Sequence, residues 1–197
     1  MDSLKLIQYL SSNLNVDEQD ILPLIENCTI KEVEKDEFLL RQNEHCKHTF
    51  FVEDGLLRQY AIDSKGKEHT ISFAPENWFV SDRESTYFNK SSAYYIQTLE
   101  NSKVIMIDEK FINTLSEKIP EFVEFNNKLL HNHIRQLQNR IIMLLGASAE
   151  ERYLQFIEMY PDILLRVPQI MVASYLGITP ESLSRVRKEL ARKNFRN

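Results

Sequence analysis

The chain has 197 residues, of which 43% are hydrophobic and 27% charged, and its formal net charge is -5. This composition is that of a globular protein, and with only four glycines and six prolines it excludes a disordered or collagen-like chain. No apolar run approaches the roughly 18 residues that a membrane span requires, so we expect no membrane partner. The low cysteine count makes a reducing cytoplasm the expected compartment. The two cysteines, Cys28 and Cys46, are too few for a disulfide scaffold or a four-thiolate metal site.

The first 108 residues change from a helical to a β sequence pattern. Residues 17–28 read as a helix, and residues 29–108 contain short alternating or aromatic runs that predict strands at 38–40, 49–52, 56–62, 69–73, 94–99 and 104–107. Asp54-Gly55 and Ser64-Lys65-Gly66 predict hairpin turns between them. Many short strands at this spacing indicate a sandwich, a barrel or a β-roll.

The texture is helical after Asp108, a predicted N-cap, and residues 121–145 contain no glycine or proline and predict one long helix. Its apolar seam has mostly 3–4 spacing, as in a coiled coil, and Asn127 fills the gap in it. A second apolar face, formed by Phe122, Phe125 and Leu129, can pack back on the β domain. We therefore expect a homodimer, with a monomer's core helix as the alternative; the predicted interface comprises Val123, Asn127, Leu130, Ile134, Leu137, Ile141 and Leu144.

A second helical region follows this long helix. Gly146 ends it, and Ser148 and Glu151 have the spacing of a capping box that begins the next helix, which extends to about residue 160.

The segment PQIMVASYLGITPESLSRVRKEL, residues 168–190, predicts a helix-turn-helix. Its first helix has Ile170, Ala173 and Leu176 facing inward. Gly177 occupies a left-handed turn position, and Thr179 and Pro180 suit the N-cap and first residue of the second helix. Leu183, Val186 and Leu190 of that helix face the core, which leaves a polar face shaped to enter a major groove.

Charge supports this interpretation. Residues 163–197 hold seven basic and two acidic residues, a net +5, whereas the rest of the chain is -10. A basic end on an acidic body predicts contact with a polyanion, and a solvated basic helix face is the alternative.

The whole chain resembles the Crp–Fnr family of bacterial transcription regulators, in the branch common in Bacteroidetes. The motifs AxYLGITPESLSRxRKEL and FVEDGLLRQY carry the resemblance. It implies an α+β protein with a cyclic-nucleotide-binding-like β-roll in residues 1–117, a dimerisation helix in 118–146 and an all-α helix-turn-helix domain in 147–197. Because few residues follow the second helix, we expect the β-hairpin wing that the family often has to be missing.

The resemblance implies a homodimeric regulator that binds palindromic double-stranded DNA and works with RNA polymerase. Glu181 and Arg185 match the family's base-reading pair, suited to cytosine and guanine respectively, and Pro180 stands where a further arginine would be. An ion pair between Glu181 and Arg185 is the structural alternative. The predicted DNA-binding residues are Gln169, Thr179, Pro180, Glu181, Ser182, Ser184, Arg185, Arg187 and Lys188, of which Gln169, Arg187 and Lys188 are expected at phosphates.

The family's phosphate-binding cassette corresponds to PENWFVSDRESTYFNKSSAYYIQTLE, residues 75–100. Ser81-Asp82 replaces its Gly-Glu, and Ser92 falls where an arginine would neutralise the cyclic phosphate. A phosphate without that arginine loses a strong charge-assisted pair, so we expect no cyclic AMP binding. The predicted pocket, formed by Ser81, Asp82, Ser91 and Ser92, then takes an unidentified effector or none.

A second class of function is a small-molecule-binding or enzymatic β-roll of the cupin type. Such a protein needs a His-x-His pair with further acidic and histidine ligands, whereas His45, His48 and His69 lack that spacing. The short run containing His45, Cys46 and His48 predicts a solvated turn. We therefore expect no enzyme activity, no cofactor and no metal.

Overall fold

The computed structural model describes residues 4–194, which form two compact units. The first unit is Met1–Ala61 with Ile71–His131, and the second is Ile62–Thr70 with Asn132–Asn197. Arg196 and the chain end at which the wing is expected to be missing lie outside the described residues. The division into residues 1–117, 118–146 and 147–197 stays a prediction, because the boundary between the two units falls after His131, within the predicted dimerisation helix.

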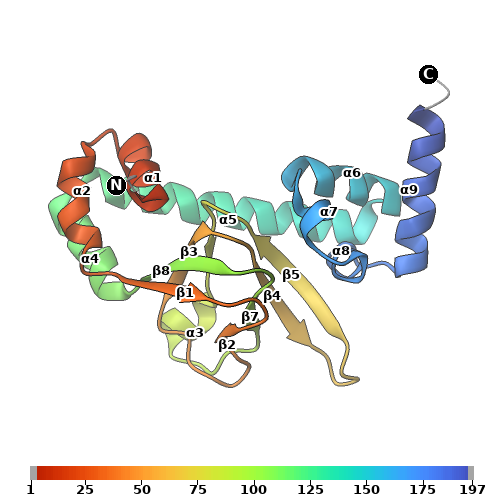
Figure 1. Ribbon diagram of the computed structural model, residues 1–197, viewed down its shortest axis with the longest axis horizontal. Helices are drawn as coiled ribbons and strands as arrows, with labels where there is room; N and C mark the ends of the chain where they lie inside the picture. The colour runs from red at the N-terminus through yellow and green to blue at the C-terminus, as the bar shows by residue number, and fades with distance from the viewer. Residues whose placement is uncertain (1–3, 195–197) are drawn as a thin grey trace. The chain divides into compact units, whose positions relative to one another are not determined.

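Two four-stranded antiparallel sheets build the β part of the first unit (Figure 1). One sheet has the order β1 (Thr29–Val33), β8 (Ser102–Ile107), β3 (Thr49–Asp54) and β6 (Phe79–Val80). The other has the order β2 (Phe38–Leu40), β7 (Tyr95–Thr98), β4 (Leu57–Ile62) and β5 (Glu68–Ala74). The β-roll expected from the sequence is confirmed, and β1 and β6 are strands that the sequence pattern did not reveal.

Alternate residues of β3 and β8 serve two cores. Phe50, Val52 and Val104 belong to the core of the roll, which also includes Leu57 and Ile96 of the second sheet. Their neighbours in sequence belong to a second core on the other face, because successive strand residues point to opposite sides of a sheet. This second core contains Phe51, Ile105 and Ile107 together with helical residues.

The turn at Asp54-Gly55 corrects a prediction from the sequence. It is not a hairpin, because β3 pairs with β8 and β6 whereas β4 pairs with β7 and β5 in the other sheet. Gly55 has φ +94°, and a Cβ there would lie 2.8 Å from the carbonyl oxygen of Asn101. Glycine is needed because the chain crosses between sheets in close contact with the start of β8.

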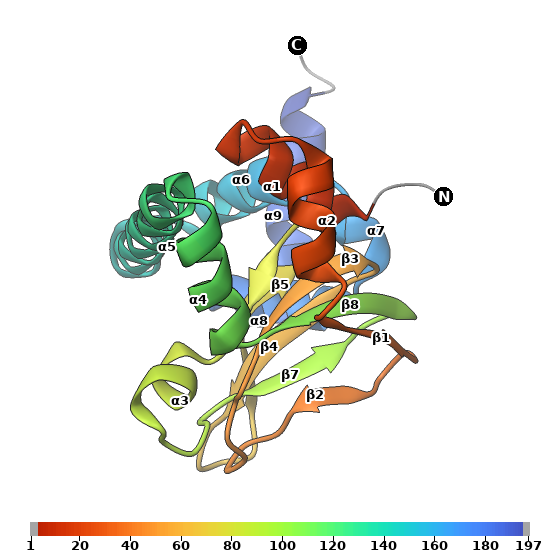
Figure 2. The same ribbon diagram turned by 90° about the vertical axis from the view of Figure 1, so that its left-hand side faces the viewer.

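Helices cover the second core of the first unit (Figure 2). They are α1 (Lys5–Leu14), α2 (Glu18–Ile25), α4 (Glu109–Lys118) and the first half of α5 (Glu121–Gly146). The sequence analysis missed α1, whose buried Leu6, Ile7, Leu10 and Leu14 have helical spacing. Its N-terminus has no side-chain cap of its own; the buried carboxylate of Glu53 in β3 accepts the Lys5 and Leu6 N–H groups instead.

The second unit contains the C-terminal helices α6 (Ala149–Met159), α7 (Ile163–Arg166), α8 (Gln169–Leu176) and α9 (Pro180–Asn194). The predicted caps are confirmed: Asp108 accepts the Phe111 N–H at 2.8 Å, and Ser148 and Glu151 form a reciprocal capping box. Among residues 4–194, no helix is long and apolar enough to cross a membrane.

Candidate nucleic-acid interface and effector pocket

Local geometry confirms the helix-turn-helix. Gly177 ends α8 in the left-handed conformation, with φ 67° and ψ 31°, and the Ile178 N–H donates to the Ala173 oxygen at 3.0 Å. Thr179 then caps α9, since its hydroxyl oxygen accepts the Ser182 N–H at 3.2 Å. A glycine at the turn and a hydroxyl cap three residues from its partner are the local features that this motif requires.

The two helices pack through small and branched side chains. Val172, Ala173 and Leu176 of α8 and Leu183 and Val186 of α9 are buried. The expectation that Ile170 faces inward is wrong, because it is 65% exposed. Val172 faces the core instead of Ile170. It shares one face of the helix with Ala173 and Leu176, whereas Ile170 lies outside that face.

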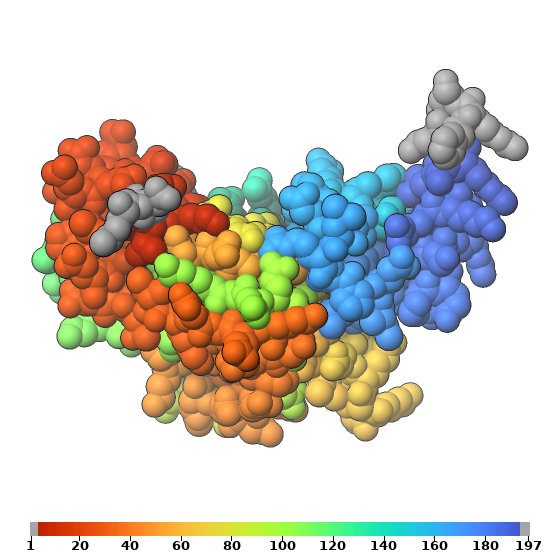
Figure 3. All heavy atoms as spheres, in the orientation of Figure 1, coloured from red at the N-terminus to blue at the C-terminus, as the bar shows by residue number. Residues whose placement is uncertain are grey.

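The polar face of α9 is open to solvent. Figure 3 shows this helix, in dark blue, at the surface of the second unit. Ser182 is half-buried beside the cap, and the other predicted DNA-binding residues are exposed: Gln169, Thr179, Pro180, Glu181, Ser184, Arg185, Arg187 and Lys188. The carboxylate of Glu181 accepts its own N–H and the Thr179 hydroxyl, and these bonds lower its pKa. Glu181 therefore interacts with the start of α9, which the sequence analysis did not anticipate.

Polar contacts distant in sequence hold α6, α8 and α9 together. Arg152 Nη1 donates to the Leu176 oxygen at 2.7 Å, at the C-terminal end of α8, where a cation is favoured. Lys193 Nζ lies 2.7 Å from Glu150 Oε1. No sequence signal pointed to these residues, because the partners are 24 and 43 positions apart.

The seam on α5 is open along its length. Its members are exposed residues of the single chain, with apolar side chains 36% to 56% exposed: Val123, Leu130, Ile134, Leu137, Ile141 and Leu144, with polar Asn127 between them. The second predicted face does pack back on the first unit, where Phe122 is buried and Phe125 lies 6.0 Å from the Tyr9 ring. A row of exposed apolar side chains is typical of an interaction surface.

The cassette region is closed by its own hydrogen bonds. Asp82 is buried, and its two carboxylate oxygens accept the Ser85 N–H at 3.2 Å and the Ser92 hydroxyl at 2.7 Å. The first bond caps α3 (Arg83–Phe88), a helix that the sequence analysis missed. Ser92 is buried, Ser81 is half-buried with its carbonyl accepting Gln59 Nε2, and Ser91 is exposed. The four predicted pocket residues therefore do not line one cavity wall: two bind each other.

A surface hollow of about 780 Å³ lies beside this region. It is lined by Glu44, His45, Cys46, Lys47, Ser85, Thr86, Asn89 and Glu109. Cys46 is buried, its N–H donating to the Ser85 hydroxyl at 2.8 Å. Among the described residues there is no group of three or more histidine, cysteine, aspartate or glutamate side chains placed to hold a metal ion.

Comparison with known proteins agrees with this architecture. The family model of the cyclic nucleotide-binding domain matches residues 30–118. The chain is 25% identical over 167 residues to the anaerobic regulatory protein of Aggregatibacter actinomycetemcomitans and to the fumarate and nitrate reduction regulatory protein of Vibrio cholerae. Each match covers 79% of this chain and 64% or 66% of the relative, so the chain spans slightly less than two thirds of their length.

The fold is also shared with solved structures. FixK2 from Bradyrhizobium japonicum superimposes with a TM-score of 0.73 at 17% identity, over 85% of this chain and 86% of that protein. The branch within the family stays a prediction. With a cyclic nucleotide-binding domain, a long helix and a C-terminal helix-turn-helix in this order, and with these relatives, the chain is similar over most of its length to regulators of the Crp–Fnr family.

Proposed function

We propose that the protein is a sequence-specific DNA-binding transcription regulator that acts as a homodimer on a palindromic site, with RNA polymerase as its partner. The observation that carries this proposal is the exposed polar face of α9. Ser184, Arg185 and Lys188 are exposed on this helix, whereas its Leu183 and Val186 are buried. A helix that is anchored by a buried apolar face and presents cationic side chains to solvent suits a major groove.

Arg185 carries the base recognition in this proposal. Its guanidinium can donate two hydrogen bonds to one guanine, which Lys188 cannot do with a single ammonium group. In the free protein the Glu181 carboxylate interacts with the Thr179 hydroxyl and its own N–H at the start of α9. A contact to cytosine would require it to give up these hydrogen bonds. Gln169, Arg187 and Lys188 contact phosphates and orient the helix.

The open seam supports the homodimer. A second copy is the occupant that fits, because the seam is continuous, has coiled-coil spacing and lies on the same helix that leads into the helix-turn-helix. Two-fold symmetry then presents two recognition helices to two half-sites.

Cyclic nucleotides are not the effector in this proposal. Asp82 already holds Ser85 and Ser92, and a serine hydroxyl at position 92 brings no positive charge to a cyclic phosphate. An unidentified effector or none acts on the β-roll. No observation favours a cupin-like enzyme, because His45 and His48 lie in a loop of the first unit and His69 pairs with Asp63 at 2.8 Å.

The test is a binding-site selection from random duplex DNA with the full chain, followed by a gel shift at several salt concentrations. We expect an enriched two-fold symmetric motif and binding that weakens steeply with salt. Recovery of unrelated sequences with no common motif would contradict the proposal.

A further inference from the structure

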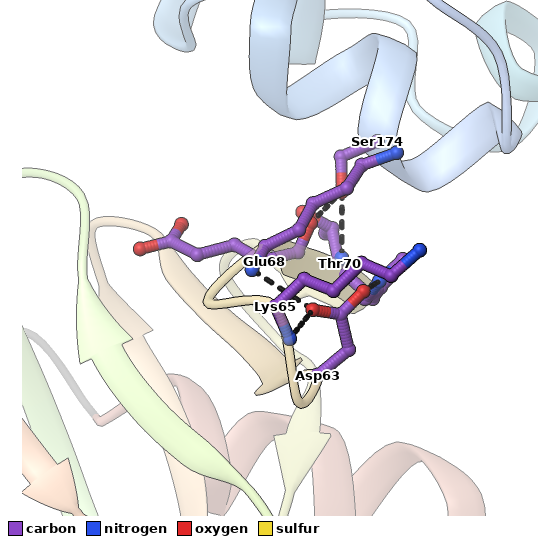
Figure 4. Close-up of polar contacts among 7 residues, drawn as sticks. Asp63, Lys65, Glu68, Thr70 and Ser174 are labelled. Atoms are coloured by element: carbon purple, nitrogen blue, oxygen red, sulfur yellow. Dashed lines mark hydrogen bonds and ion pairs between the residues drawn. The ribbon is translucent and has the colours of Figure 1, made fainter.

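The tip of the β4–β5 hairpin, Ile62–Thr70, belongs to the second unit, where it contacts α8. β5 is an edge strand, so its outward N–H and C=O groups need partners outside the sheet. The Ser174 hydroxyl supplies both: it donates to the Glu68 oxygen at 2.9 Å and accepts the Thr70 N–H at 2.9 Å (Figure 4). One hydroxyl thus replaces the missing neighbour strand at two alternate residues.

Arg140 of α5 joins the same elements. Its Nη2 donates to the Thr70 oxygen at 3.2 Å and to the Tyr175 oxygen at 2.9 Å, and its guanidinium carbon lies 3.7 Å from the centroid of the Tyr175 ring. The Tyr175 oxygen is among the last carbonyls of α8, which have no partner inside the helix and attract cations. Arg140 therefore connects α5, β5 and α8 at one point.

The hairpin tip is itself held in shape. Asp63 accepts the Lys65 and Lys67 N–H groups at 2.9 and 3.0 Å and the His69 ring nitrogen at 2.8 Å. The bond from His69 is the main cause that lowers the pKa of Asp63 to about 2, so the carboxylate stays ionised at neutral pH. The strand that meets Ser174 is thus preformed.

We propose that Ser174 and Arg140 form a clasp that fixes the helix-turn-helix against α5 and the hairpin tip, and that this clasp sets the spacing of the two recognition helices. The residues are positioning residues for DNA binding, and the proposal rests on the proposed function. Between α5 and α6 the chain has only Ala147 and Ser148, so contacts between side chains and backbone must fix how the helix-turn-helix sits on α5. When one subunit of a dimer is bound to its half-site, the effective concentration of the other recognition helix at the second half-site is high only if the spacing between the two helices is fixed.

The first experiment measures hydrogen exchange at the Thr70 amide in the full chain without DNA. We expect Ser174→Ala to speed that exchange roughly three- to tenfold, because it removes the acceptor, and Ser174→Thr to restore protection. Thr70→Val is the matched control, since the Thr70 hydroxyl is buried without a hydrogen-bond partner among the described residues and its loss leaves both backbone bonds. Equal exchange at this amide in wild type and Ser174→Ala would overturn the clasp.

The second experiment compares binding to the selected palindrome and to a duplex with one half-site, by fluorescence anisotropy at one salt concentration. Ser174→Ala should weaken palindrome binding roughly three- to tenfold, with a change below about twofold on the half-site, and Ser174→Thr should recover it. An equal loss on both duplexes would refute the spacing role. If wild type selects no motif, the proposed function and the spacing role both fail, whereas the exchange of Thr70 still reports on the clasp.

Discussion

Replacing Leu137 by glutamate should prevent the proposed homodimer from forming and leave a monomer. Leu137 is 42% exposed in the single chain and lies in the middle of the seam. Full burial of a leucine side chain contributes about 1.5–3 kcal/mol, so covering the exposed part contributes about 1 kcal/mol per chain and about 2 kcal/mol per dimer. Leu137→Ala should therefore raise the dimer dissociation constant about 30-fold.

Glutamate has a larger effect than alanine, because it also brings two carboxylates out of water at the subunit contact. Each desolvated charge costs several kcal/mol, so Leu137→Glu should be monomeric at micromolar concentration. The fold of the single chain should survive, since this side chain is 42% exposed and is not among the buried core residues of the chain.

Light scattering coupled to gel filtration measures the outcome against a chain mass of 23.3 kDa. Asn132→Glu is the matched control: it adds the same charge two residues from Leu130, about 200° around the helix and away from the seam. Circular dichroism should be unchanged in both variants. A dimer of unchanged stability in Leu137→Glu would refute the assignment of the seam.

Three further outcomes are expected. Arg185→Ala should cost about 2–6 kcal/mol of specific binding per dimer and relax the selected motif, whereas Lys188→Ala should weaken all sequences about equally and flatten the salt dependence; selection and titration on both variants distinguish these roles. Calorimetry with cyclic AMP and cyclic GMP should detect no binding, and a micromolar dissociation constant for either would contradict the interpretation of Asp82 and Ser92. Gly55→Ala should lower the free energy of unfolding by about 2 kcal/mol or more in denaturant titrations, because its Cβ meets the backbone of β8. Gly66→Ala, with φ +79° but open space, should lose only about 1 kcal/mol, and equal losses would show that the close approach at position 55 is unimportant.

The sequence alone determined the features that depend on residues within about one helical turn. The caps at Asp108, Ser148 and Thr179 and the left-handed glycine at position 177 were predicted correctly, because each partner lies within three or four residues of the other. The bounds of β2 agree with the predicted range 38–40 for the same reason: periodicity and flanking turn residues are local signals.

Tertiary structure decided which elements meet, and hence the details of the candidate site. The sequence showed a turn at Gly55 but not that the chain changes sheets there, because strand pairing is set by contacts tens of residues apart. Helix α1 has a cap from Glu53, 48 positions away from Lys5, so no local motif marked its start. The bond between Asp82 and Ser92, and the contact of Ser174 with the hairpin 104 positions earlier, arise in the same way. Residue types and spacing establish what a helix or strand can present, whereas long-range packing determines the groups to which its polar atoms are bound.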